Sequence, residues 1–136
     1  MKTQRVLTHT EALAVLSYIR AELEQQGLAA AVAVVDDHGE LMAFVRTDGC
    51  PLASIVIAQN KAFSAARERR ETRTIGESSR QDAWPLTNFG DLRYVGWGGG
   101  VPLRADGLVI GGVGVSGLPE GVDMELARAG AAVLEV

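Results

Sequence analysis

The N-terminal part of the chain shows apolar residues at a helical period. Thr8 and Glu11 have the spacing of a capping box, in which the hydroxyl and the carboxylate each satisfy an otherwise unpaired backbone N–H. Gly27 can take the left-handed conformation that ends a helix. We therefore expect an amphipathic helix between these signals. Its apolar face is expected to hold Leu13, Leu16, Ile19 or Arg20, and Leu23.

Two short β-type runs follow, at residues 30–35 and 40–46. The turn Asp36-Asp37-His38-Gly39 separates them, and its glycine supplies the positive φ that a tight hairpin needs. Alternation along the second run puts Leu41, Ala43 and Val45 on one side, and Met42, Phe44 and Arg46 on the other. This pattern predicts a β-hairpin.

Residues 52–69 read as a helix that is apolar nearly all round, which indicates burial on more than one side. A narrow stripe of small residues along it includes one cation: Ser54, Ala58, Lys61 and Ala65. A lysine in that position must either extend to solvent or meet a negative charge.

The second half of the chain is less regular at first and then returns to strands. We expect a short helix at 74–82 and a flap carrying Trp84, Leu86 and Phe89, followed by strands at 92–97, 101–104 and 108–115 and a helix at 120–134. Gly111, Gly112 and Gly114 thin the last strand, which favours close packing across it. The element order predicts an α/β (α+β) fold with a mostly antiparallel five-stranded sheet flanked by helices.

Composition limits the classes of function. The 136 residues, 47% of them hydrophobic, suit a single domain spanning 1–136. A formal charge of −4 gives no electrostatic case for nucleic acid. No apolar stretch approaches the length of a membrane span. Cys50 is the single cysteine, so no internal disulfide can form, and a reducing cytoplasm is the expected location.

The most unusual local feature is a tryptophan followed by three glycines, Trp97 and Gly98, Gly99 and Gly100. Without Cβ atoms the main chain can approach a ligand closely and expose its N–H groups. A glycine-softened strand with a bulge explains the same residues. The sequence leaves both interpretations open.

Three charged residues are candidates for chemistry. Lys61, if buried, could bind a carboxylate or act as a base or Schiff-base amine. Arg46 could clamp a ligand carboxylate, although a solvated charge at a strand end explains it equally well. Asp48 could act as an acid or base or orient Lys61, or could simply open a turn.

Other site types find little support. The histidines, His9 and His38, have no companion at metal-ligand spacing, so no metal site is predicted. His9 could be an axial haem ligand, as could Met42 or Tyr94. A phosphate-binding fingerprint after a strand is missing, which disfavours nucleotide binding.

The chain resembles the GlcG/HbpS family (DUF336), a haem-binding group related to the C-terminal domain of PduO. The resemblance rests on segments that occur in order: Val34 to Gly39, Phe44 to Gly49, the helix Ser54 to Ala66 around Lys61, Gly98 to Leu103, and Gly111 to Gly117, with Glu120, Asp123 and Ala129-Gly130 near the end. It implies a profilin-like domain that forms homo-oligomers, with a pocket between the glycine-rich strand and the lysine helix.

The resemblance implies haem binding, with haem degradation or redox sensing as further functions of some relatives. Arg46 and Lys61 would then meet the carboxylates of a flat, anionic ligand, and Trp97 with Gly98 to Gly100 would contact its plane. Trp97 could instead fill the space that haem needs. Two alternatives stay open: a cofactor-free enzyme acting on a small carboxylated metabolite through Lys61 or Asp48, and a non-catalytic oligomeric scaffold.

Overall fold

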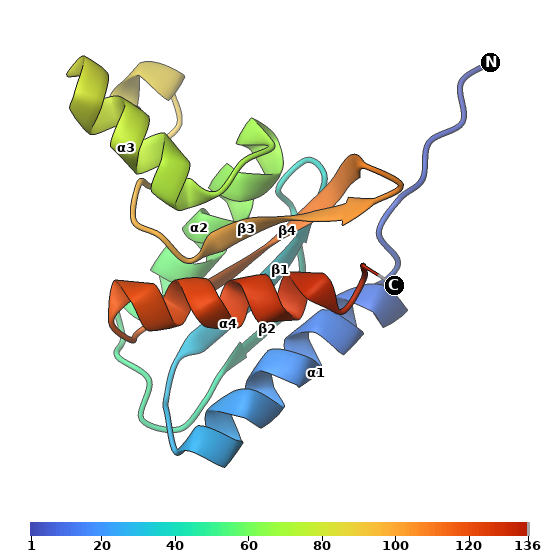
Figure 1. The fold of residues 1–136 in the computed structure, drawn as a ribbon, viewed down its shortest axis with the longest axis vertical. Helices are drawn as coiled ribbons and strands as arrows, with labels where there is room; N and C mark the ends of the chain where they lie inside the picture. The colour runs from blue at the N-terminus through green and yellow to red at the C-terminus, as the bar shows by residue number, and fades with distance from the viewer. Residues whose placement is uncertain (136) are drawn as a thin grey trace.

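The computed structural model describes residues 1–135 (Figure 1). The elements follow in the order α1 (His9–Gln26), β1 (Ala31–Asp36), β2 (Leu41–Arg46), α2 (Ser54–Glu68), α3 (Thr72–Asp82), a short 3-10 helix η1 (Leu86–Phe89), β3 (Gly100–Ala105), β4 (Leu108–Ser116) and α4 (Glu120–Ala132).

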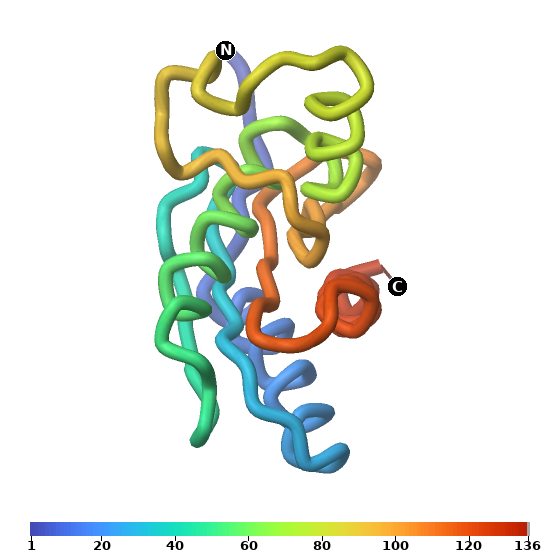
Figure 2. Tube along the Cα trace, turned by 90° about the vertical axis from the view of Figure 1, so that its left-hand side faces the viewer, coloured from blue at the N-terminus to red at the C-terminus, as the bar shows by residue number. Residues whose placement is uncertain are grey.

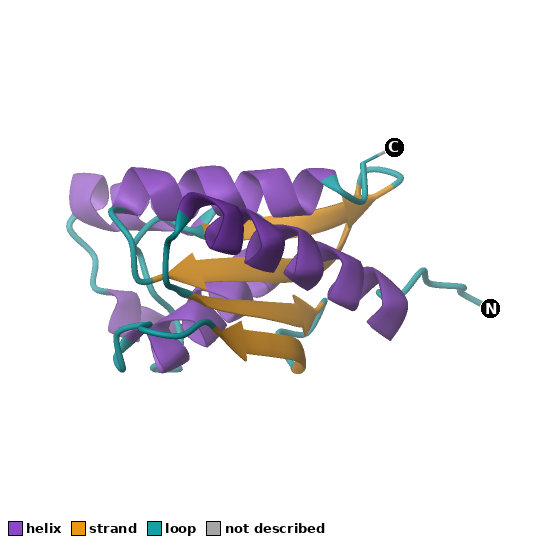
Figure 3. Cartoon of the chain, turned by 90° about the horizontal axis from the view of Figure 1, so that it is seen from below, coloured by secondary structure: helices purple, strands orange, loops and turns teal. Residues whose placement is uncertain are grey.

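The strands form one antiparallel sheet in the order β2-β1-β4-β3. Helices α1 and α4 cover one face and α2 covers the other (Figure 3). The expected α+β class with an antiparallel sheet flanked by helices is confirmed. The number of strands was wrong, because the described part of the sheet has four and not five.

The missing strand is the one expected at 92–97. The Val95 N–H donates to the Ser64 hydroxyl of α2, at 3.0 Å, instead of to a neighbouring strand. The Tyr94 ring stacks on Phe89, with centroids 4.1 Å apart, and meets Phe63 edge-on at 5.2 Å. These aromatic contacts hold the segment against α2, and through Phe89 they connect the expected flap to the body of the protein. Figure 2 shows the flap and α3 together at one end of the molecule.

Helix α1 begins and ends at the signals that predicted it. Thr8 and Glu11 form the reciprocal capping box, and Gly27 adopts the left-handed conformation with φ 67°. One residue of the expected apolar face was wrong: Leu13 is 49% exposed. The face that is buried consists of Ala12, Val15, Leu16, Ile19 and Leu23.

The predicted hairpin is present, with Gly39 at φ 91° in its turn. A bulge changes the alternation in β2, because Val34 pairs with Ala43 whereas Val35 pairs with Leu41. Met42 is the extra residue, so Leu41 does not share a face with Ala43 as expected.

The two faces of the sheet are packed differently. Between the sheet and α1 and α4 lies a core of branched side chains, including Val32, Val34, Val113 and Val115. Between the sheet and α2 the core is made of alanines and little else. A Cβ on Gly112 or Gly114 would overlap a backbone carbonyl oxygen of α2. The glycines of β4 therefore allow the close packing that the sequence favoured.

No helix in residues 1–135 is both long and apolar enough to cross a membrane.

Candidate functional site

Lys61 lies at the centre of the candidate site. It is 3% exposed, in the middle of α2, with alanines around it. Its Nζ donates to the Asp123 carboxylate at 3.0 Å and to the Val115 carbonyl oxygen at 2.9 Å. A buried lysine needs such partners because desolvation of an unpaired ammonium is costly. Of the two fates that the sequence left open for this lysine, the structure shows the meeting with a negative charge.

The ion pair joins helices on opposite faces of the sheet. Lys61 comes from α2, whereas Asp123 is in the first turn of α4. The lysine side chain reaches across beside Gly99, which has φ 122°. A Cβ on Gly99 would lie 2.9 Å from the lysine Nζ and 2.7 Å from the Val115 carbonyl oxygen. Gly99 therefore makes room for the ion pair.

The neighbouring glycines also face protein atoms. A Cβ on Gly100 would overlap the Lys61 carbonyl oxygen and approach Thr72, whose hydroxyl accepts the Gly100 N–H at 2.9 Å. A Cβ on Gly98 would meet the sulfur of Met124 at 2.6 Å. In this structure the close approach made possible by the three glycines is to α2, α3 and α4.

Asp123 balances opposing influences. Burial raises the pKa of its carboxyl, while the Lys61 ammonium and backbone N–H groups at the β4–α4 turn oppose that shift. One of these donors is the Leu118 N–H, 3.2 Å from Oδ1. The Asp123 carboxylate is thus held by Lys61 of α2 and by the turn that precedes α4.

Glu120 forms a second charged pair next to the first. Its Oε2 accepts the Gly98 N–H at 2.6 Å, and its Oε1 accepts from Arg73 of α3, also at 2.6 Å. The Gly98 N–H, followed by the charge of Arg73, lowers the pKa of this carboxyl against the opposing effect of desolvation. Glu120 thereby ties the glycine segment to α4.

These residues surround a cavity of about 300 Å³. The two serines of its wall, Ser54 and Ser116, are 5% and 4% exposed. Trp97 also lines the cavity but is 60% exposed, so it lies at the opening. The lining consists of Ser54, Ile57, Lys61, Trp97, Gly98, Ser116, Gly117, Leu118, Glu120 and Asp123.

The structure brings together only some of the residues that the sequence singled out. Lys61, Trp97 and Gly98 line this cavity. Arg46, the last residue of β2, and Asp48, two residues further on, are exposed and are not part of the lining of this cavity. Their roles in binding or catalysis stay predictions.

Asp123 and Glu120 were not predicted as site residues. The pair Lys61 and Asp123 spans 62 positions in sequence, so no local spacing indicates it. The available signal was that both acids stand in the first turn of the last helix, where a carboxylate also has an ordinary dipole role.

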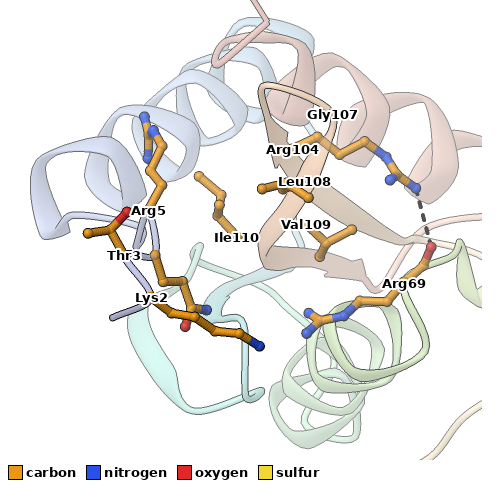
Figure 4. A pocket seen from close by; sticks show the side chains of 10 residues that line it. Lys2, Thr3, Arg5, Arg69, Arg104, Gly107, Leu108, Val109 and Ile110 are labelled. Atoms are coloured by element: carbon orange, nitrogen blue, oxygen red, sulfur yellow. Dashed lines mark hydrogen bonds between the residues drawn. The ribbon is translucent and has the colours of Figure 1, made fainter.

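A second cavity lies at the opposite end of the β3–β4 hairpin (Figure 4). It measures about 530 Å³, and Leu108, Val109 and Ile110 form its apolar part. The N-terminal residues 2–5 cover it and are held there by Gln4, which donates to Asp37 at 2.7 Å, and by an ion pair between Arg5 and Glu11. Residues 2–5 thus complete this cavity.

The second cavity is cationic. Lys2, Arg5, Arg69 and Arg104 line it, and none of its lining residues is acidic. Arg5 is paired with Glu11, but Lys2, Arg69 and Arg104 make no ion pair within residues 1–135. Arg104 donates to the Arg69 carbonyl oxygen at 3.2 Å, the interaction drawn in Figure 4. Carboxylate or phosphate groups are the complementary ligands.

The possible haem ligands lie outside both cavities. His9 is exposed in the first turn of α1, and Met42 is packed partly against the core. Tyr94 stacks on Phe89 of the flap. Across the described residues, no three His, Cys, Asp or Glu side chains gather as a metal site.

The fold and site define a class of small α+β proteins in which a buried lysine and aspartate pair crosses the end of an antiparallel sheet. A family model described as "Haem degrading protein HbpS-like" matches residues 7–132, and the chain belongs to this family.

Individual relatives cover nearly the whole chain. Protein GlcG of Escherichia coli (strain K12) is 37% identical over 122 residues, which are 85% of each chain. A crystal structure of a double mutant of Streptomyces reticuli HbpS superposes with a TM-score of 0.88 at 32% identity, over 98% of this chain and 90% of that one. The PduOC:heme complex superposes with a TM-score of 0.89 at 25% identity, over 97% of both chains.

Proposed function

We propose that this protein binds haem. The observation that carries the proposal is the match of the HbpS-like model to almost the entire chain, supported by the similarity to a PduO domain whose structure is a haem complex. Haem degradation or redox sensing, which the resemblance also implies, would each begin with this binding step.

The cavity around Lys61 does not fit haem. It is small, and no His, Cys, Met or Tyr, the usual axial ligands of haem iron, lines it. The lysine that was expected to meet a ligand carboxylate is already neutralised by Asp123 at 3.0 Å. The same pairing gives less support to an enzyme that binds a carboxylated metabolite through Lys61.

The cationic cavity fits the porphyrin better. The run Leu108 to Ile110 offers apolar contact, and Lys2, Arg69 and Arg104 offer unpaired charges for two propionates. None of its lining residues is a usual axial ligand of haem iron. The first candidate for that role is His9, which is exposed and closely follows the N-terminal arm, residues 2–5. Bound haem would supply a redox-active iron; the chain supplies the charges and the apolar contact.

A haemin titration tests binding. We expect a saturable shift of the Soret band at a fixed stoichiometry. The double variant K2A/R104A removes two of these unpaired charges and should weaken haemin binding about tenfold or more, the loss expected for about 1.4 kcal/mol. R20A is the matched control, because Arg20 is exposed on α1 and pairs with Glu24 away from the cavity.

Two further outcomes separate binding from its location. A non-saturable Soret change in the unmodified protein would contradict haem binding itself. Saturable binding that K2A/R104A leaves unaltered would contradict the cationic cavity as the place where haem binds. H9A should shift the position of the Soret band if His9 is the axial ligand, because the band reports the ligand of the iron.

A further inference from the structure

The cavity around Lys61 contains two serine hydroxyls that the protein leaves free. Ser54 begins α2 and Ser116 ends β4, and both residues are more than nine-tenths buried. Neither hydroxyl hydrogen-bonds within residues 1–135, although every fully buried side-chain nitrogen or oxygen described there has a partner. Burying a hydroxyl without a partner costs free energy, so these two oxygens must be open to the cavity.

The charged groups around the same cavity are already matched. Lys61 is paired with Asp123 at 3.0 Å, and Glu120 with Arg73 at 2.6 Å. A charged ligand would enter without a free counter-charge and would lose its hydration. An uncharged ligand avoids that cost. Its hydroxyl groups could still donate to carboxylate oxygens and exchange hydrogen bonds with the serines.

The remaining walls limit the size of the ligand. About 300 Å³ lies at the small end of the range for ligand sites, roughly 300–1,000 Å³. Ile57 and Leu118 add apolar surface suited to a short carbon chain, and exposed Trp97 stands at the opening. Polar groups converging on a short apolar wall are typical of a small-molecule site.

We propose that this cavity binds a small, uncharged compound carrying two or more hydroxyl groups, with Ser54 and Ser116 as its hydrogen-bonding partners. The site is separate from the cationic cavity, and the proposal does not depend on haem binding.

Titration of the 15N-labelled protein with glycerol, followed by amide chemical shifts, tests the proposal. We expect saturable shifts centred on Gly98, Ser116, Gly117 and Leu118. S54A and S116A should each weaken glycerol binding about threefold to tenfold, whereas S17A, an exposed serine of α1, should leave it unchanged. The amide spectra of the variants without ligand establish that they are folded.

Acetate and methylammonium serve as charged probes of comparable size. We expect weaker binding of both than of glycerol at this site. Tighter binding of acetate would overturn the uncharged class and return the site to a carboxylate ligand. Glycerol shifts that do not saturate, or that survive both serine substitutions unchanged, would overturn the site itself. A failed haemin titration with positive glycerol shifts would remove only the haem proposal.

Discussion

The two cavities of this protein differ in how their charges are used. In the first cavity Lys61 is paired with Asp123 at 3.0 Å, and Glu120 is paired with Arg73 of α3 at 2.6 Å. The polar side chains of its wall without a partner in the described part of the chain are neutral serine hydroxyls. At the far end of the β3–β4 hairpin, Lys2, Arg69 and Arg104 have no acidic partner among residues 1–135. The charges of the first cavity connect two helices, whereas three cations of the second cavity make no ion pair with the described residues and are available to an anion.

We therefore expect the charged residues of the first cavity to contribute to the stability of the fold as well as to ligand binding. A buried ion pair that joins α2 to α4 contributes to the structure whether or not a ligand is present. The second cavity lies on the surface, where charges are solvated and contribute little to stability. Substitutions should therefore lower stability at the Lys61 cavity and weaken ligand binding at the cationic cavity.

The largest effect is expected from D123A. Removing the carboxylate leaves the Lys61 ammonium buried without its counter-charge, which should cost about 3–5 kcal/mol of unfolding free energy. R104A in the cationic cavity should change it by less than about 1 kcal/mol. Urea denaturation of both variants measures the difference. Equal losses would contradict the structural role assigned to the buried pair.

A matched pair of glycine substitutions comes next. G99A places a Cβ against the Lys61 Nζ and the Val115 carbonyl at positive φ and should cost about 2–4 kcal/mol. G107A, in the hairpin turn at φ 76°, meets no atom within 4 Å and should cost only about 1 kcal/mol for its conformation. Thermal unfolding of the two variants compares a crowded glycine with an open one; the same loss for both would contradict the crowding at Gly99.

The binding of haemin and the binding of glycerol should differ in their dependence on salt concentration. Haemin binding in the cationic cavity depends on attraction between exposed charges, so raising the ionic strength from about 0.01 M to 1 M, which shortens the screening length from about 30 Å to 3 Å, should weaken it several-fold. Glycerol binding should hardly change, because glycerol is uncharged and the charged side chains of the wall are paired within the protein. Parallel titrations at both salt concentrations measure this. A strong salt effect on glycerol would contradict the charge balance of the first cavity.

The smallest effect concerns Glu11, which anchors the N-terminal arm through Arg5. The Arg5 guanidinium, followed by the Thr8 N–H, lowers the pKa of Glu11 to about 2 from an ordinary value of 4.5. Because the folded-state pKa is depressed, its contribution to stability is present above about pH 4.5 and is lost as the pH falls toward 2. E11Q keeps a capping residue but no charge.

The wild-type protein should therefore exceed E11Q in stability by less than about 1 kcal/mol at neutral pH, and the difference should close as the pH falls through 2. Urea denaturation across this range measures the difference. A gap that persists at low pH would show that charge is not its origin.

Local signals in the sequence predicted most elements of the fold. The capping box of Thr8 and Glu11, Gly27 and the hairpin turn at Gly39 each act within a few residues, and each was confirmed. The strand expected at 92–97 was wrong, because the Val95 N–H donates to the Ser64 hydroxyl of α2 and not to a neighbouring strand. That partner lies on another element, so the alternation of residues within the segment could not reveal it.

The sequence predicted only part of the candidate site. Lys61 stood out because a lysine among small residues on an apolar helix needs an explanation, but nothing near it in sequence supplied Asp123. The glycines after Trp97 indicated a close approach without saying to what. Only the fold shows that Gly99 and Gly100 lie against Lys61 and that Gly98 lies against Met124.

The alanine and glycine packing between α2 and β4 has a mechanical consequence. With backbone against backbone at Gly112 and Gly114, there is no layer of side chains that could change rotamer and let α2 slide or turn. That wall of the Lys61 cavity is fixed. Any adjustment of the cavity to an occupant must come from the opposite wall, where Trp97 is largely exposed and Gly98 is held by a single carboxylate of α4.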